Sequence, residues 1–278
     1  MFAEDEKIIR SYLVGDFEQK FFDACLGNLT NIGNPLRLNN FAYAMRELIR
    51  NVLGRLAPTD EVIASPWYEQ NEVVDGPTRA QRMKYAIQGW LSDETMQNEL
   101  HVDIAKTLKE LKDSVNDLSK YTHVESNTFD VKAEEVDDMS NNVFENVAKF
   151  FTIIQKKRKA VLDAVMDYVD EDMVQQFYQT INPDIDLLAS HHEIENYWVK
   201  HIEKEDDRDG CVHVLVRGDV EVRLQYGSDG DVRRGDGYEM YENFPFTAEL
   251  DVSYKNQYGD IRILEDGHYT FDTDSFYE

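Results

Sequence analysis

The sequence has only two cysteines, no long apolar run and few basic residues, and each shortage excludes a class of protein. Cys25 and Cys211 cannot form a disulfide framework, so a reducing cytoplasm is expected. No stretch approaches the roughly 18 apolar residues of a membrane helix, so no membrane association is expected. The charged N-terminus also lacks the basic and apolar regions of a signal peptide.

The shortage of basic residues gives a formal net charge of −26, from 55 acidic and 29 basic residues. A field of this sign repels phosphates, which argues against a broad surface that coats DNA or RNA. A local basic cleft, a metal-assisted site and a basic protein partner stay open. The acidic excess is greatest in residues 181–278, which hold 24 acidic and 9 basic side chains.

The spacing of apolar residues changes near residue 185. Helical spacing before that point predicts helices over about 6–27, 38–56, 79–92, 96–121 and 136–170, which is typical of an up-and-down bundle. Strand spacing follows, with Val212–Val216 and Val220–Tyr226 predicted to form a hairpin around a Gly218-Asp219 turn. The sequence therefore predicts an α+β chain, with a helical bundle over 1–180 and a small antiparallel β sandwich or barrel-like domain over 190–278.

Two arginines on the second predicted helix are candidate phosphate ligands. Arg46 and Arg50 are four residues apart and share a helix face, and a planar guanidinium can bind phosphate in a bidentate manner. The alternative is a solvated face on which Glu47 pairs with Arg50. His123, at the end of the fourth predicted helix, is the candidate general acid or base, with Lys120 and Tyr121 as candidate substrate contacts. Its alternative is a favourable interaction with the helix dipole.

Candidate metal ligands and anion contacts in the β region are weaker. His191 and His192 are adjacent on a predicted strand and point to opposite faces, so no metal site is predicted there. The glycine-rich segment 227–237 resembles a calcium loop but lacks the closing glutamate and flanking helices of an EF-hand. It is either a long hairpin connection or a binding loop, and Arg233 and Arg234 are its candidate substrate contacts.

Four segments together resemble the bacterial proteins called predicted pPIWI-associating nucleases. They are residues 41–50, 79–89, 118–124 and 224–228 with the following loop and 244–246. The resemblance spans most of the chain and implies a component of prokaryotic conflict or phage-defence systems with nuclease activity.

The helical half is also similar in layout to HEPN domains, helical bundles that often act as metal-independent RNases and as dimers. Their signature is an arginine followed four to six residues later by a histidine. Here Lys120 is the nearest base before His123, and no arginine lies between Arg82 and Arg158. Arg46 or Arg50 would therefore have to supply the cation from a neighbouring helix.

Two functions follow as hypotheses. The first is a defence-associated phosphodiesterase that acts on nucleic acid, with His123, Arg46 and Arg50 as catalytic residues. It needs no assigned cofactor, although a divalent metal and a homodimer stay open. The second is a non-enzymatic acidic adaptor or regulator that binds a partner protein through its β domain. An acidic nucleic-acid mimic is a third reading.

Overall fold

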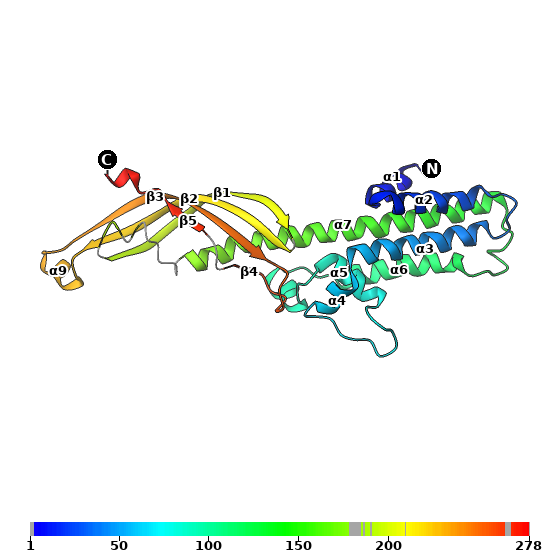
Figure 1. Ribbon diagram of the computed structural model, residues 1–278, viewed down its shortest axis with the longest axis horizontal. Helices are drawn as coiled ribbons and strands as arrows, with labels where there is room; N and C mark the ends of the chain where they lie inside the picture. Colours follow the sequence, from blue (N-terminus) through cyan, green and yellow to red (C-terminus); the bar gives the residue numbers. More distant parts are fainter. Residues whose placement is uncertain are drawn as a thin grey trace. The chain divides into compact units, whose positions relative to one another are not determined.

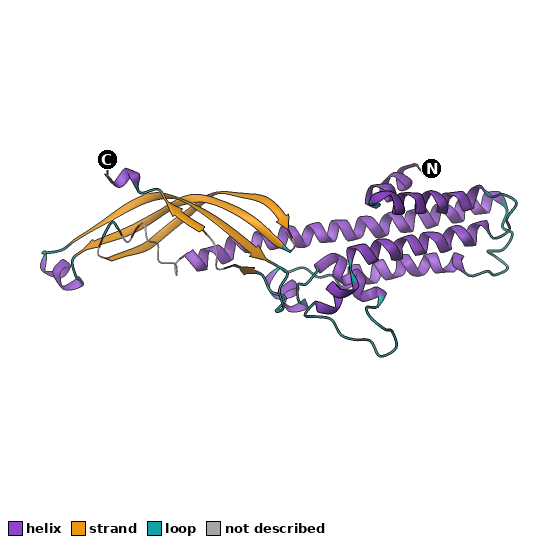
Figure 2. Ribbon diagram, in the orientation of Figure 1, coloured by secondary structure: helices purple, strands orange, loops and turns teal. Residues whose placement is uncertain are grey.

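A computed structural model describes residues 3–177, 185, 187–189, 191–208, 210–264 and 268–277. Residue contacts divide the chain into two compact units, Met1–Ala164 and Val165–Glu278. The first unit is helical and the strands belong to the second (Figures 1 and 2). The α+β class predicted from the sequence is confirmed. The predicted boundary near residue 180 stays a prediction, because residues 178–184 lie outside the described ones.

The first unit contains most of the helices. They are α1 (Ala3–Tyr12), α2 (Gly15–Thr30), α3 (Arg37–Leu56), α4 (Thr59–Ala64), α5 (Arg79–Gln88), the π-helix η1 (Thr95–Glu99), α6 (Ala105–Thr122) and the part of α7 (Ala133–Phe177) up to Ala164. The α2, α3 and α6 helices run beside the first part of α7 in an up-and-down bundle (Figure 1). The predicted core face of α3 is confirmed, since Phe41, Met45 and Leu48 are fully buried.

Two predicted helices are each broken in the structure. The predicted helix 6–27 is α1 and α2, separated by Leu13 and Val14, and Gly15 at the start of α2 has a φ of +74° that a continuous helix does not allow. The predicted helix 96–121 is η1 and α6, and His101 between them has a φ of +54°. The apolar spacing predicted the buried faces but missed both breaks, because each break depends on local backbone conformation.

Glu18 fixes the junction of α1 and α2 through hydrogen bonds at both carboxylate oxygens. Arg55 Nε donates to Oε1 at 2.8 Å, Arg55 Nη2 donates to Oε2 at 3.0 Å, and the backbone N–H of Val14 donates to Oε2 at 2.7 Å. Burial alone would raise the pKa of Glu18, but these bonds outweigh it and hold the pKa below its usual value. The buried carboxylate is therefore ionised and paired in the folded unit.

We expect Glu18→Gln to lower the free energy of unfolding by about 2 kcal/mol at neutral pH, because charge-assisted bonds are lost. The folded pKa lies below the unfolded value of about 4.3, so the carboxylate stabilises the fold above that value. That contribution disappears as the pH falls through the folded pKa. Urea unfolding of wild type and variant at neutral and acidic pH measures this, and a difference independent of pH would contradict it.

The second unit is built on one antiparallel sheet. Its strands are β1 (His191–Arg208), β2 (Cys211–Tyr226), β3 (Tyr238–Ser253), β4 (Arg262–Ile263) and β5 (His268–Phe271). The order is β1-β2-β3-β4, and β5 pairs with β3. The described strands form a single open sheet, without the second sheet of a sandwich or the closure of a barrel. Its apolar face includes Val214, Val216 and Val222, which are fully buried.

The predicted turn at Gly218-Asp219 is wrong. Both residues lie inside β2, where Gly218 pairs with Val199 of β1 and Phe246 of β3. Glycine is needed here because the Phe246 ring and the Trp198 backbone occupy the space of a side chain. The segment 227–237 instead connects β2 to β3 and holds the short helix α9 (Asp229–Arg234), which begins with a capping box of Ser228 and Asp231.

Candidate functional site

His123 lies directly after α6, and α3 fixes its backbone. The side-chain amide of Asn39 donates to the carbonyl oxygens of Tyr121 and His123, at 3.0 and 3.1 Å. Asn39 is 4% exposed, and its Oδ1 has no hydrogen-bond partner among the described residues. The imidazole of His123 belongs to an exposed residue. A buried amide therefore holds an accessible histidine at one end of the α3–α6 pair.

Arg46 and Arg50 follow Asn39 along α3. They lie seven and eleven residues beyond Asn39, which is about two and three helical turns and places all three on one side of the helix. The rise of about 1.5 Å per residue puts them roughly 10 and 16 Å along the axis from Asn39. Arg46 and Arg50 therefore lie on the same side of α3 as Asn39, which contacts the His123 backbone, but further along the axis of α3.

The local contacts of these cations differ. Arg50 pairs with Glu47, with Nε 2.7 Å from Oε2, as the solvated-face alternative anticipates. The guanidinium of Arg46 lies 6.0 Å from the centre of the Tyr43 ring. Lys120 pairs with Asp117 at 2.5 Å, and this contact raises the pKa of Lys120. The catalytic roles of Arg46 and Arg50 and the substrate-binding role of Lys120 stay predictions.

Arg233 and Arg234 belong to the other unit, on α9. Both are exposed. Arg234 pairs with Asp231 at 2.6 Å and approaches Asp236 at 3.8 Å. These carboxylates offset much of its charge, so an anion contact there would have to displace an existing ion pair.

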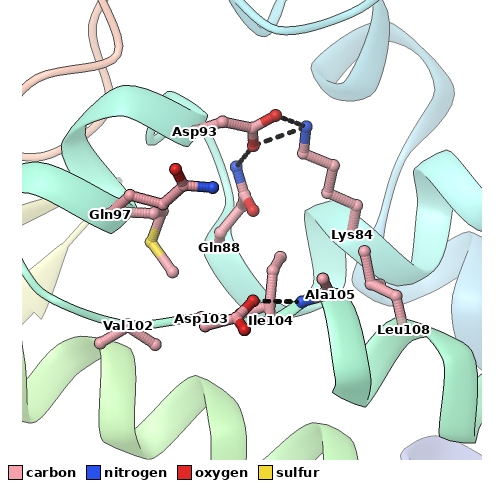
Figure 3. Close-up of a pocket in the computed structure, with 10 residues that line it drawn as sticks. Lys84, Gln88, Asp93, Gln97, Val102, Asp103, Ile104, Ala105 and Leu108 are labelled. Carbon is pink, nitrogen blue, oxygen red and sulfur yellow. Dashed lines mark hydrogen bonds and ion pairs between the residues drawn. The ribbon is translucent and has the colours of Figure 1, made fainter.

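A cavity, absent from the sequence prediction, lies between α5, η1 and the start of α6 (Figure 3). Its volume is about 130 Å³. The lining residues are Lys84, Gln88, Asp93, Met96, Gln97, Val102, Asp103, Ile104, Ala105 and Leu108. The apolar spacing had identified the helix that carries Lys84 and Gln88, but it gave no sign that the segments on either side would close a cavity.

Lys84, Gln88 and Asp93 form one hydrogen-bonded group at the cavity. Lys84 Nζ lies 2.7 and 2.8 Å from the two carboxylate oxygens of Asp93, and it also lies 4.4 Å from the centre of the Trp67 ring. The side chain of Asp93 is 59% exposed, and partial loss of its hydration opposes ionisation. The bonds from Lys84 and Gln88 outweigh that effect and hold the pKa of Asp93 below its usual value. The group is therefore an ionised pair in a fixed position.

The opposite wall of the cavity has unusual backbone. A π-helix is rare and often occurs at functional sites, and a histidine with positive φ is uncommon. Here η1 is such a π-helix and His101 has a positive φ. His101 Nδ1 lies 3.2 Å from the carbonyl oxygen of Gln97. This backbone places Val102, Asp103 and Ile104 along the cavity.

Metal and membrane features are not found in the described part of the chain. No three histidine, cysteine or acidic residues of that part are grouped closely enough to hold a metal ion. None of its helices combines the length and apolar character needed to cross a membrane.

Comparison with known proteins assigns this two-unit α+β chain to a family. Two family models match, over residues 10–147 and 154–277, and both describe a predicted pPIWI-associating nuclease. The chain belongs to the predicted pPIWI-associating nuclease family, as the four sequence segments indicated. No curated protein and no solved structure matches it.

Proposed function

We propose that the protein is a phosphodiesterase that cleaves nucleic acid as part of a prokaryotic phage-defence system. The observation that carries this proposal is the match of both family models, which together span nearly the whole chain. The defence role and the chemistry of the substrate are parts of the proposal.

His123 is the proposed general acid or base, and α3 supplies the proposed phosphate contacts. The side chain of His123 is accessible while Asn39 fixes its backbone, which suits proton transfer to a bound strand. Arg46 and Arg50, roughly 10 and 16 Å along the axis of α3 from Asn39, are the proposed cations for the reacting phosphate and its neighbours on an extended strand. Binding should therefore weaken as salt rises.

Cleavage of single-stranded RNA and DNA by wild type, His123→Ala and His201→Ala, with and without divalent metal, tests this proposal. His201 is an exposed histidine of the sheet and serves as the matched control. We expect wild type and His201→Ala to cleave, and His123→Ala to lose about 100-fold or more in rate. Arg50→Gln should weaken strand binding and reduce its salt dependence.

Each alternative result has a clear meaning. Cleavage that persists in His123→Ala but requires metal would move the site to carboxylates. No cleavage by wild type in either condition would contradict the enzyme proposal and favour the adaptor.

The adaptor is a second candidate because one face of the sheet is acidic and carries exposed aromatic rings. The register places Trp198 opposite Asp219, and Tyr241 and Glu193 opposite Arg223, all on one face. Trp198 is 49% exposed and Tyr241 58%. Such a face suits a basic protein segment. Salt-sensitive binding of a basic peptide, lost in Trp198→Ala, by a protein that cleaves nothing would support it.

A further inference from the structure

A row of exposed lysines runs along α6 toward His123. We call Lys106, Lys109, Lys112 and Lys120 the lysine row. At 3.6 residues per turn, their positions fall within about one third of the circumference of the helix, so the four side chains share one side. All four lysines are exposed, and so is His123, three residues beyond the last of them.

The lysine row is cationic and largely uncompensated. Lys106, Lys109 and Lys112 make no ion pair with any described residue, whereas Lys120 pairs with Asp117. The exposed Asp113 lies on the same side of α6 and offsets one of these charges. The whole chain has a net charge of −26, so most of the surface repels a polyanion while this row attracts one.

The length of the lysine row corresponds to a short nucleic-acid strand. Lys106 and Lys120 are fourteen residues apart, which is about 21 Å along the helix axis. A stacked strand carries one phosphate per roughly 3.4 Å, so the row spans about six phosphates. The ammonium group of lysine sits on a flexible stem and can follow such a backbone. The row therefore provides a path for a strand that reaches His123.

Two exposed aromatic rings lie close in structure to His123. Phe129 is 48% exposed, and the neighbouring Thr128 donates from Oγ1 to the carbonyl oxygen of His123 at 2.8 Å. Tyr43 is 54% exposed and lies about one helical turn after Asn39, whose amide donates to the same carbonyl oxygen at 3.1 Å. A nucleic-acid base can stack on such a ring when it is unpaired, as in a single strand.

We propose that a single-stranded nucleic acid binds along α6, with its phosphates on the lysine row and an unpaired base stacked on Phe129 beside His123. Cations that follow the backbone, combined with rings that take the bases, bind single strands without reading their sequence. RNA and DNA share both features, so the proposal includes both. It rests on the proposed function in taking nucleic acid as the ligand, and it adds the path and the strandedness.

The test measures binding by fluorescence anisotropy, with labelled RNA and DNA strands of about eight nucleotides and with a duplex of the same sequence. Every binding experiment uses the full-length protein with His123→Ala, so that cleavage cannot shorten the strand. Lys109→Gln with Lys112→Gln removes two charges of the lysine row. Lys149→Gln with Lys156→Gln on α7 is the matched control, because both of these lysines are also exposed and without an ion pair among the described residues.

We expect the His123→Ala protein and the α7 control to bind the single strand equally, and the α6 double variant to bind about tenfold or more weakly at low salt. The slope of log affinity against log salt should fall by about 1.4 in the α6 variant, because each phosphate contact of a single strand contributes about 0.7. Equal losses in the two double variants, no loss in the α6 variant, or no binding at all would overturn the inference. So would displacement of the strand by polyglutamate as effectively as by unlabelled strand, which would assign the lysine row to an acidic protein partner.

Phe129→Leu tests the stacked base, because leucine keeps an apolar side chain and removes the ring. Phe17→Leu is its matched control, since Phe17 is an exposed ring near the start of α2. We expect Phe129→Leu to weaken binding of the single strand about tenfold and to leave binding of the duplex unchanged. Unchanged binding of the single strand, equal losses in both ring variants, or duplex binding as tight as single-strand binding would contradict the single-strand assignment.

Cleavage by proteins that retain His123 separates this inference from the proposed function. Binding along α6 without cleavage by wild type would retain the strand path and remove the phosphodiesterase. Cleavage with the same kcat/KM in wild type and in the Lys109→Gln, Lys112→Gln variant would retain the phosphodiesterase and remove the strand path.

Discussion

Replacing Gly218 by alanine is expected to destabilise the sheet unit by about 3 kcal/mol, because the added methyl group has no space. Its Cβ would collide with the carbonyl oxygen of Trp198 and lie 2.5 Å from Cε1 of Phe246. The first obstacle is backbone of β1, which cannot rotate away as a flexible side chain can. Hydrogen exchange should accelerate in peptides that cover β1, β2 and β3.

Gly54→Ala is the matched control for this prediction. Gly54 lies in α3, and a Cβ built there meets no atom within 4 Å. Alanine should therefore stabilise the helical unit by roughly 0.5–1 kcal/mol through its higher helix propensity. Unchanged exchange of the sheet peptides in Gly218→Ala would show that β1 and Phe246 can move aside, and it would contradict the close packing of β1, β2 and β3 at Gly218.

The error at Gly218 shows what the sequence could not reveal. A glycine followed by aspartate between two alternating runs is a strong local signal for a hairpin turn. The same two residues are also compatible with one long strand, in which the glycine has no side chain and so leaves space for an aromatic ring of a neighbouring strand. Only the pairing of Gly218 with Phe246, which is distant in sequence, decides between the two.

The helical prediction succeeded where burial depends on spacing alone. Leu38, Phe41 and Met45 recur at helical intervals, and all three are buried in α3. The predicted position of His123 at the end of a helix is confirmed, since α6 ends at Thr122. It could not supply the distance between Arg46, Arg50 and His123, because that depends on how α3 and α6 align.

The cavity at Gln88 was beyond sequence reasoning for a related reason. Lys84 and Gln88 are on one helix, but Asp93 follows that helix and Asp103 lies in an irregular segment after a π-helix. Neither the hydrogen bonds of a π-helix nor the positive φ of His101 produces a periodic pattern of apolar residues in the sequence.

Phe144→Ala is expected to cost the helical unit about 4 kcal/mol, because one ring joins three helices. Phe144 of α7 is 2% exposed, and its ring centre lies 5.2 Å from that of Phe41 in α3 and 6.5 Å from that of Phe22 in α2. Alanine would leave a cavity that the surrounding rings cannot fill without separating the helices. Urea unfolding followed by circular dichroism at neutral pH measures the loss.

The matched control for Phe144 is Phe17→Ala. Phe17 lies on α2, is 66% exposed and contacts Phe21 at a ring separation of 5.9 Å. Its removal should change the free energy of unfolding by no more than about 0.5 kcal/mol, because little apolar surface returns to water. Similar losses in the two variants would mean that the Phe22–Phe41–Phe144 cluster does not hold α2, α3 and α7 together. A large loss of unfolding free energy in Phe144→Ala alone would show that this cluster holds α3 in place, and with it the positions of Asn39, Arg46 and Arg50.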